Sequence, residues 1–184
     1  MSLLVLIRHS KTSPSADSQP SDWPLSEEGR ALCVPLAETL RPLDLDILTS
    51  SRMIRAQQTA ELLGACLGLK WHTSHGLEEH NRPFVEGWLD FEPLIEALFA
   101  NPARRVFGDS ADETLARFSA GIDAVLAEEP NRSVGVVSHG TVMALYAAPY
   151  FDMTPRDLWH AIGHPSVLVI DRETGRGLQI IDSL

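Results

Sequence analysis

Two histidines follow short apolar runs that have the composition of buried strands. His9 comes directly after Arg8 at the end of the run Leu3–Ile7, and His139 closely follows the run Val134–Val137. A neutral imidazole carries a nitrogen lone pair that can attack phosphorus, and a guanidinium can neutralise phosphate oxygens through two parallel hydrogen bonds. These residue types favour nucleophilic chemistry on a phosphoryl group. One histidine after one strand would more often be structural or exposed, so the argument depends on the pair.

The residues after His139 strengthen this interpretation. If both strands are central and parallel, both imidazoles emerge at the same edge of the sheet, where open α/β sheets bind their ligands. A helix is expected to begin after Gly140, at about Thr141, and its free N-terminal amides would favour an anion. His139 would then stabilise the equatorial oxygens of the phosphoryl group during transfer.

Arg55 is a further candidate cation. It falls in the first turn of a helix expected over Met53–Leu67, beside free backbone donors, so it can meet an anion held above the sheet edge. Arg52 would be the solvent-exposed member of this pair of arginines. On composition alone, both could equally be ordinary surface residues.

The elements that must position these side chains alternate between short apolar runs and longer amphipathic ones. This alternation predicts an α/β fold, a three-layer α/β/α sandwich around a mostly parallel central sheet. Strands are expected at residues 3–7, 47–49, 71–73 and 134–137, with a closing hairpin at 166–170 and 178–181. Helices are expected at residues 26–40, 53–67, 115–126 and 141–147, the first kinked or shifted by Pro35. Residues 10–24 and 75–87 lack a clear period and are expected to be functional loops.

Length and charge set further limits. The 184 residues, 44% of them hydrophobic, suit a single domain over residues 1–184, and no stretch is apolar enough to cross a bilayer. We expect a cytoplasmic monomer or homodimer whose two cysteines, Cys33 and Cys66, are buried thiols. A formal charge of −10 disfavours nucleic acid as a partner, and no membrane partner is expected. An anionic substrate must therefore be captured by a local cluster of cations.

Several short motifs occur in a fixed order and together span nearly the whole chain. They are Arg8-His9, Pro24-Leu25-Ser26-Glu27-Glu28-Gly29-Arg30, Ser50-Ser51 leading to Arg55-Ala56 and Thr59-Ala60, Leu77-Glu78-Glu79, and Ser138-His139-Gly140. Each motif is short, but the ordered set resembles the histidine phosphatase superfamily, the phosphoglycerate mutase-like family. The resemblance implies a phosphoglycerate mutase-like sandwich and chemistry on phosphate esters.

The resemblance also implies roles for single residues. His9 is similar to the family's phosphate-accepting nucleophile, and the phosphate pocket around it would consist of Arg8, Arg55 and His139. Glu79 would protonate the leaving oxygen and then activate the hydrolytic water, with Glu78 as its nearest competitor.

The residues after His9 depart from the family pattern. Ser10 and Lys11 stand where the family usually has Gly and often Glu, so altered substrate contacts are expected. Lys11 would suit a second anionic group on the substrate, or it is a solvated surface lysine, and the same two interpretations apply to Arg82. The residues predicted to contact the substrate are Ser10, Lys11, Arg82, Gly140 and Thr141.

The nucleophile must be neutral in order to attack. One nitrogen of His9 is therefore expected to donate to a backbone carbonyl, which leaves the other lone pair for phosphorus. No metal or other cofactor is expected, because the cations supply a metal's charge role. A rival interpretation has His9, His139 and a carboxylate bind zinc, but no ligand spacing supports it and the arginines would repel the ion. The remaining histidines show no spacing that indicates a site, and most of them are expected to be surface or packing residues: His72, His75, His80, His160 and His164.

Together, these features predict a phosphomonoester phosphatase that acts on a small phosphorylated metabolite through a phosphohistidine on His9. The alternatives are phosphoglycerate mutase-type transfer, dephosphorylation of protein phosphohistidine, and a catalytically silent scaffold that binds phosphate. Hydrolysis is favoured over mutase activity because a mutase must exclude water from its intermediate. Larger members of the family cover the pocket with extra segments, whereas this chain is short.

Overall fold

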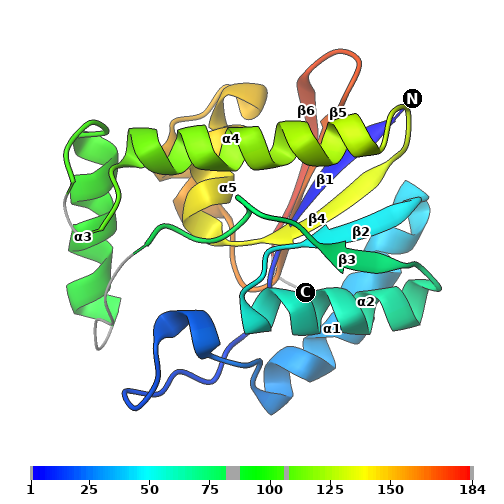
Figure 1. Cartoon of the computed structure of the whole chain (residues 1–184), viewed down its shortest axis with the longest axis horizontal. Coiled ribbons are helices and arrows are strands. Elements are labelled where there is room, and N and C mark those ends of the chain that lie inside the picture. The colour runs from blue at the N-terminus through cyan, green and yellow to red at the C-terminus, as the bar shows by residue number, and fades with distance from the viewer. Residues whose placement is uncertain (1, 82–87, 106–107, 183–184) are drawn as a thin grey trace.

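One six-stranded sheet forms the centre of the molecule. The structure, a computed structural model, describes residues 2–81, 88–105 and 108–182. The strands lie in the order β3-β2-β4-β1-β5-β6 (Figure 1). The four strands from β3 to β1 are mutually parallel, and β5 is antiparallel to both of its neighbours. Their bounds are β1 Leu3–Arg8, β2 Ile47–Ser50, β3 Trp71–Thr73, β4 Val134–Ser138, β5 Ser166–Asp171 and β6 Arg176–Asp182. The predicted mostly parallel sheet and closing hairpin are confirmed.

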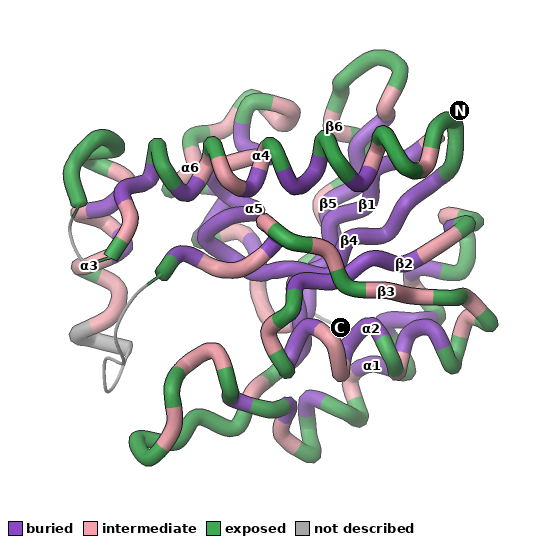
Figure 2. The backbone as a smooth tube through the Cα atoms, in the orientation of Figure 1, coloured by how far each residue is buried: buried purple, intermediate pink, exposed green. Residues whose placement is uncertain are grey.

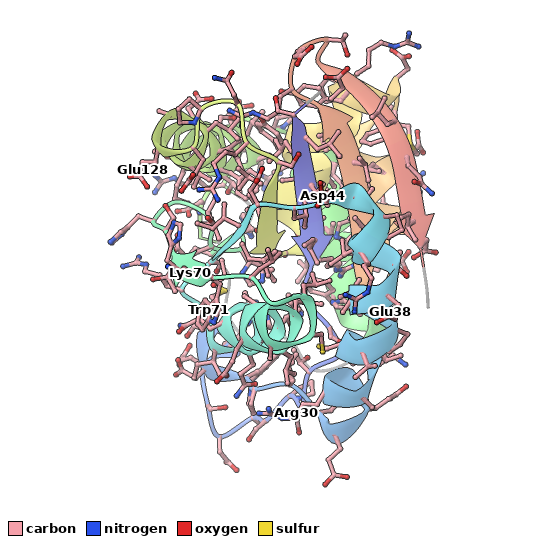
Figure 3. All side chains as sticks on the ribbon, turned by 90° about the vertical axis from the view of Figure 1, so that its right-hand side faces the viewer. Arg30, Glu38, Asp44, Lys70, Trp71 and Glu128 are labelled. Atoms are coloured by element: carbon pink, nitrogen blue, oxygen red, sulfur yellow. The ribbon has the colours of Figure 1, made fainter. Side chains whose placement is uncertain are left out.

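Helices cover both faces of the sheet. One face carries α1 (Glu27–Leu40) and α2 (Ile54–Leu67), and the other carries α3 (Trp88–Ala100), α4 (Ala111–Glu128), α5 (Gly140–Ala147) and α6 (Pro155–Ala161). Figure 3 looks along the layers, with α4 near Glu128 on one side of the sheet and α2 near Trp71 on the other. The three-layer sandwich predicted from the sequence is confirmed.

The central strands are buried on both faces, which explains their continuous apolar composition. All six residues of β1 and all five of β4 are buried (Figure 2). Side chains alternate along β1: Leu4 and Leu6 join the core under α4 and α5, while Val5 and Ile7 join the core under α1 and α2. The two cores therefore hold β1 in a fixed register, and the residues that follow it inherit that position.

Local sequence signals explain the helix starts. The Ser26 side chain caps α1 by accepting from the Gly29 amide at 3.0 Å, and the helix runs through Pro35 to Leu40. At the start of α4, Ser110 and Glu113 form a reciprocal capping box. The helices α3 and α6 are absent from the sequence predictions, because Pro93 interrupts the pattern of α3 and α6 has only seven residues.

Two expectations from composition have different outcomes. Cys33 is buried as predicted, but the prediction that Cys66 is buried is wrong, because this residue lies on an exposed position of α2. Among the described residues, the structure contains no helix long and apolar enough to span a membrane.

The sheet register brings three strand ends to one edge. Arg8 pairs with Ser138 across β1 and β4, and the His9 amide donates to the Ser138 carbonyl at 3.0 Å. Because β5 runs the other way, its first residue, Ser166, also lies opposite Arg8. Residues that follow β1 and β4 and residues that precede β5 therefore meet at the same place.

Candidate active site

His9 and His139 lie side by side at this edge. Their ring centroids are 5.1 Å apart in an edge-to-face arrangement, and the residues are only 5% and 0% exposed. His9 directly follows β1, whereas His139 follows β4 and is the N-cap residue of α5. The expectation that two parallel strands deliver both imidazoles to one site is met.

The hydrogen bonds of His9 fix its tautomer. Its Nδ1 lies 2.7 Å from the Ser10 carbonyl oxygen, which can only accept, so Nδ1 carries the proton. Its Nε2 accepts a hydrogen bond from Arg55 Nε at 3.0 Å. The ring is thus a neutral imidazole whose Nε2 lone pair points at the Arg55 guanidinium. A nucleophile needs such a lone pair, and an anionic group needs such a cation beside it.

Arg55 reaches this position from the first turn of α2. Its side chain is buried, and Nη1 donates to the Pro20 carbonyl at 2.5 Å while Nη2 contacts Met53 Sδ at 3.2 Å. The long segment after β1 folds back over the guanidinium through Pro20. The site is therefore built from the ends of β1 and β4, the start of α2 and this returning loop.

Arg8 lies against the start of α5. Its Nη1 donates to the Ile162 carbonyl at 2.5 Å, and Gly140 makes room for the guanidinium, because a Cβ at Gly140 would lie 2.7 Å from Arg8 Cζ. Burial, more than any neighbouring charge, lowers the pKa of Arg8 to about 10, so the side chain stays charged at neutral pH. Gly140 thus allows a buried cation to approach the helix start.

Several buried polar atoms at this edge have no hydrogen-bond partner among the described residues. His139 Nε2 lies 2.8 Å from Ser51 Oγ, but its Nδ1 has no hydrogen-bond partner within residues 2–81, 88–105 and 108–182. The same holds, within that described part of the chain, for Arg8 Nε and Ser10 Oγ. Unsatisfied buried donors are rare in folded proteins, and several in one site favour an anion that would satisfy them.

The electrostatics keep the imidazoles neutral. Burial first, and then the charge of Arg55, hold the pKa values of His9 and His139 well below the usual value. Protonation would add a cation beside Arg8 and Arg55 without a compensating charge. A phosphate dianion would supply that charge, so the site suits a substrate that carries one.

His164 is a third imidazole beside His9, at a position to which the sequence analysis assigns no role in the site. Its ring centroid lies 5.0 Å from that of His9. Burial, followed by the charges of Arg8 and Arg55, lowers its pKa to about 2. The signal was present in the predicted hairpin, because a strand antiparallel to β1 must begin at the edge where β1 ends.

Glu79 lies at the start of α5. Its Oε2 accepts from the Thr141 amide at 3.1 Å, and its Oε1 accepts from the amides of Val142 at 3.2 Å and His80 at 2.8 Å. The N-terminal amides of α5, which the sequence analysis expects to favour an anion, donate in this structure to the carboxyl group of Glu79. The amide of Thr141 is therefore engaged.

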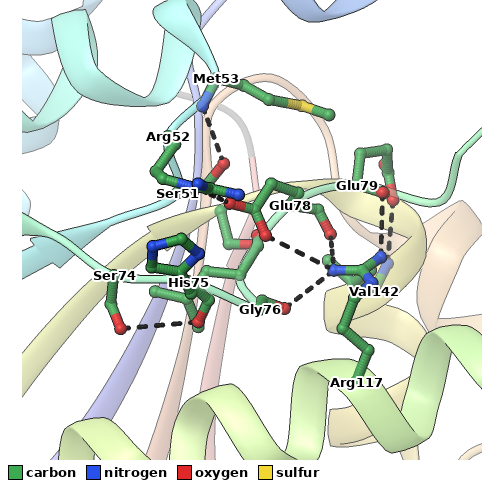
Figure 4. Close-up of polar contacts among 12 residues, drawn as sticks. Ser51, Arg52, Met53, Ser74, His75, Gly76, Glu78, Glu79, Arg117 and Val142 are labelled. Carbon is green, nitrogen blue, oxygen red and sulfur yellow. Dashed lines mark hydrogen bonds and ion pairs between the residues drawn. The ribbon is translucent and has the colours of Figure 1, made fainter.

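Glu78 has a different environment (Figure 4). Its Oε1 accepts from Arg52 Nε at 2.7 Å, and its Oε2 lies 3.8 Å from Arg117 Nη1. Burial acts to raise the pKa of Glu78, but the hydrogen bond and the charge of Arg52 outweigh it, so the pKa is lowered. Glu78 is thus held between two cations, Arg52 and Arg117.

The other residues predicted to contact the substrate lie in different environments. The Ser10 amide donates to Thr59 Oγ1 at 3.2 Å, whereas the Lys11 side chain is 46% exposed and pairs with Glu28. The prediction for Arg82 lies outside the described residues. Of the other histidines, His75 is exposed, whereas His80 is buried with Nε2 at 2.6 Å from the Asp109 carbonyl.

A small open cavity of about 90 Å³ adjoins Arg55. Arg55 and Glu79 both line it, so the proposed acid and a cation of the phosphate pocket share one space. The other lining residues are Gln19, Pro20, Ser21, Met53, His80 and Asn81.

The zinc interpretation gains no support from the arrangement of ligands. Within the described residues, one group of three side chains could hold a metal ion, and it consists of Glu92, Glu96 and His160. Glu96 already pairs with Arg156 at 2.5 Å. Neither His9 nor His139 belongs to this group.

Comparisons with known proteins identify the family and the fold of the chain. A family model described as "Histidine phosphatase superfamily (branch 1)" matches residues 4–180. A mycobacterial glucosyl-3-phosphoglycerate phosphatase, solved with VO3, is 24% identical over 100% of both chains, with a TM-score of 0.77. YhfR from Bacillus stearothermophilus is 21% identical over 100% of this chain and 98% of that chain, with a TM-score of 0.76.

A further similar structure is a putative alpha-ribazole-5'-P phosphatase from Escherichia coli. It is 23% identical and covers 99% of this chain and 96% of that chain, with a TM-score of 0.72. At these identities the solved structures establish the fold, while the family model covers nearly the whole sequence. A search of curated proteins finds no match.

Proposed function

Since the chain belongs to the histidine phosphatase superfamily and is a hydrolase, we propose that it cleaves phosphomonoesters through a phosphohistidine on His9. Glu79 serves as general acid in the first step and as general base in the second. Arg8, Arg55 and His139 bind the phosphoryl oxygens. The position of the His9 ring carries the proposal, because Nδ1 is held by the Ser10 carbonyl and Nε2 faces Arg55 in a pocket of cations.

In the first step, the Nε2 lone pair of His9 forms a bond to phosphorus. The ester P–O bond breaks, and the departing oxygen takes a proton from the Glu79 carboxylic acid, which becomes a carboxylate. For this attack, the contact between Arg55 Nε and His9 Nε2 must open, and Arg55 then donates to phosphoryl oxygens. The bound dianion thus replaces the nucleophile as the partner of the guanidinium.

In the second step, water attacks the phosphohistidine. Glu79 takes a proton from the water, the oxygen forms a bond to phosphorus, and the N–P bond breaks to release inorganic phosphate. Glu79 is then protonated again and His9 is neutral, so the enzyme returns to its starting state. The cavity that Glu79 and Arg55 share supports a path for both the leaving group and the water.

The proposed substrate is a small phosphorylated metabolite in the cytoplasm. Similar folds belong to phosphatases of glucosyl-3-phosphoglycerate and of alpha-ribazole-5'-P, both small phosphorylated molecules. The pairing of Lys11 with Glu28 gives no support to a second anionic subsite at Lys11. No metal or other cofactor is proposed for the reaction, and the protein acts as a monomer or homodimer.

The test is direct trapping of the intermediate. After rapid mixing with p-nitrophenyl phosphate, alkaline quench and mass spectrometry should find one phosphoryl group on His9, and free phosphate should accumulate. A phosphoryl group on another residue, or turnover without any phosphoenzyme, would contradict the mechanism. Incubation with 3-phosphoglycerate separates the alternatives: free phosphate supports hydrolysis, and isomer formation supports mutase activity.

A further inference from the structure

Arg117 connects α4 to the loop that carries Glu79. Its Nη1 donates to the carbonyls of Gly76 at 2.9 Å and Glu78 at 2.8 Å, and its Nη2 donates to the carbonyl of Glu79 at 3.1 Å (Figure 4). One guanidinium therefore binds three carbonyls within four consecutive residues. A guanidinium presents its donors in a rigid plane, so these contacts restrain the direction of the backbone as well as its position.

The loop depends on such contacts because it has no regular structure of its own. Residues 74–81 belong to no helix or strand, so their backbone groups need other partners. The remaining carbonyl of this stretch, that of Leu77, accepts from Ser138 Oγ at 2.8 Å, and the Leu77 side chain is fully buried. The side chains of Arg117 and Ser138 thus satisfy every carbonyl from Gly76 to Glu79.

The surface of α4 is shaped for this loop. Gly76 has a φ of 85°, in the left-handed region, and it packs against Gly121, where a Cβ would lie 2.9 Å from the His75 carbonyl oxygen. Arg117 lies one helical turn before this close approach. Glu78, between Arg52 and Arg117, then pairs with cations on both sides.

We propose that Arg117 is a positioning residue for the general acid. It holds the backbone of Glu79 so that the carboxyl group lies both against the amides of Thr141 and Val142 and in the cavity beside Arg55. This inference rests on the proposed role of Glu79. The hydrogen bonds of Arg117 go to the loop, and its charge also helps burial to lower the pKa of His139, an effect that Arg117→Lys retains.

The proposal predicts a specific kinetic signature. Removal of Arg117 leaves three carbonyls without their donor and lets Glu79 shift, and a displacement of about 1 Å can reduce a rate by roughly 100-fold. The loss of rate should be largest for substrates whose leaving oxygen must be protonated as it departs. The kcat/KM for an alkyl phosphate, a poor leaving group, should fall by about 100-fold, and that for p-nitrophenyl phosphate by only about threefold.

The chain provides a matched control in Arg172. Its guanidinium also donates to three backbone carbonyls, those of Leu126, Glu129 and Arg132, but at the far end of α4. Arg172→Met should reduce stability as Arg117→Met does and leave the ratio of the two kcat/KM values unchanged. Arg117→Lys keeps the charge with fewer fixed donors and should give an intermediate ratio.

The comparison with Glu79→Gln distinguishes two kinds of failure. If Glu79→Gln changes the ratio but Arg117→Met lowers both kcat/KM values equally, the positioning role of Arg117 is wrong and the proposed function stands. If Glu79→Gln itself lowers both equally, the assignment of Glu79 as acid is wrong, and the inference about Arg117 falls with it. If Arg117→Met does not fold, the ratio for Arg117→Lys decides, and a ratio equal to that of wild type overturns the proposal.

Discussion

Buried polar groups at the two ends of the sheet differ in whether they have hydrogen-bond partners. At the end where β5 finishes, the Asp171 carboxylate accepts from the Glu173 amide and the Thr174 hydroxyl, and Arg172 donates to three carbonyls. At the end where β5 begins, buried polar atoms of Arg8, Ser10 and His139 have no partner in the described parts of the chain. The strand β5 therefore runs from an edge with unpaired buried polar atoms to an edge where the polar groups are hydrogen-bonded.

This difference supports the proposal that one end of the sheet stabilises the fold and the other binds substrate. An unsatisfied buried polar group costs about 1–3 kcal/mol of stability, and neutral imidazoles beside arginines add an electrostatic constraint. Such costs are common where a protein is preorganised for a ligand. Changes at the active-site end should therefore affect activity more than stability, and changes at the far end should do the reverse.

The largest expected effect is that of His9→Asn. Loss of the nucleophile should lower kcat/KM by about 10⁴-fold or more, because the proposed phosphoenzyme forms on His9. The free energy of unfolding at pH 7, measured by urea denaturation, should change by less than about 2 kcal/mol. A variant that keeps wild-type turnover would contradict the mechanism, and one that fails to fold would contradict the contrast between the two ends.

The next effect concerns pH. The folded-state pKa values of His9 and His139 lie below those of the unfolded chain, so the unfolded state binds more protons at acidic pH. Stability is then fully present above about pH 6.5 and falls as pH decreases. His164 behaves in the same way, so the three buried histidines should together lower the free energy of unfolding by roughly 3 kcal/mol between pH 6.5 and 5.5, about 1 kcal/mol each.

Denaturation at several pH values checks this expectation. His139→Asn should reduce the slope by about a third, because one of the three titrating histidines is removed. Saturating inorganic phosphate should also reduce the loss, since the bound anion favours the charged imidazoles. A flat profile in wild type over this pH range would show that the histidines are not held neutral.

A smaller effect is expected for Gly140→Ala. The new Cβ would lie 2.7–2.8 Å from three atoms of the Arg8 guanidinium, and the end of this long side chain must move aside. We expect kcat/KM to fall by about 30-fold and phosphate affinity to weaken with it, which steady-state inhibition by phosphate measures. The melting temperature should not fall, because alanine is favourable in a helix. Lower stability with unchanged phosphate affinity would reverse the expected pattern.

The smallest effect is that of Arg172→Met at the far end. Loss of its contacts to backbone carbonyls should lower the free energy of unfolding by about 1–2 kcal/mol, measured by urea denaturation. The kcat/KM for p-nitrophenyl phosphate should stay within about twofold of wild type. A large loss of activity would mean that the two ends of the sheet are coupled.

The strands that carry the two histidines could be predicted because central strands are continuous apolar runs with a definite length. The meeting of His9 and His139 followed from parallel pairing alone. Arg55 was also predictable, because its place in the first turn of α2 depends only on the local helix pattern. The order of the motifs then gave the family, which the match over residues 4–180 confirms.

The parts that could not be predicted depend on contacts between distant segments. The different surroundings of Glu78 and Glu79 arise from Arg52, Arg117 and the amides of α5, and no local period indicates these partners. Lys11 pairs with Glu28 only because the loop after β1 returns along α1. His164 was missed because the topology of the hairpin, and no motif, brings it to the site.

The contact between Arg55 and His9 has a consequence for chemical reactivity. The Nε2 lone pair of His9 accepts a hydrogen bond from Arg55, and the Pro20 carbonyl helps to hold the Arg55 guanidinium in that position. An anionic reagent can draw the guanidinium onto its own oxygens and uncover the nitrogen, whereas a neutral alkylating or acylating reagent has no charge with which to do so. The protein therefore keeps a reactive imidazole protected from indiscriminate modification until a group of the correct charge arrives.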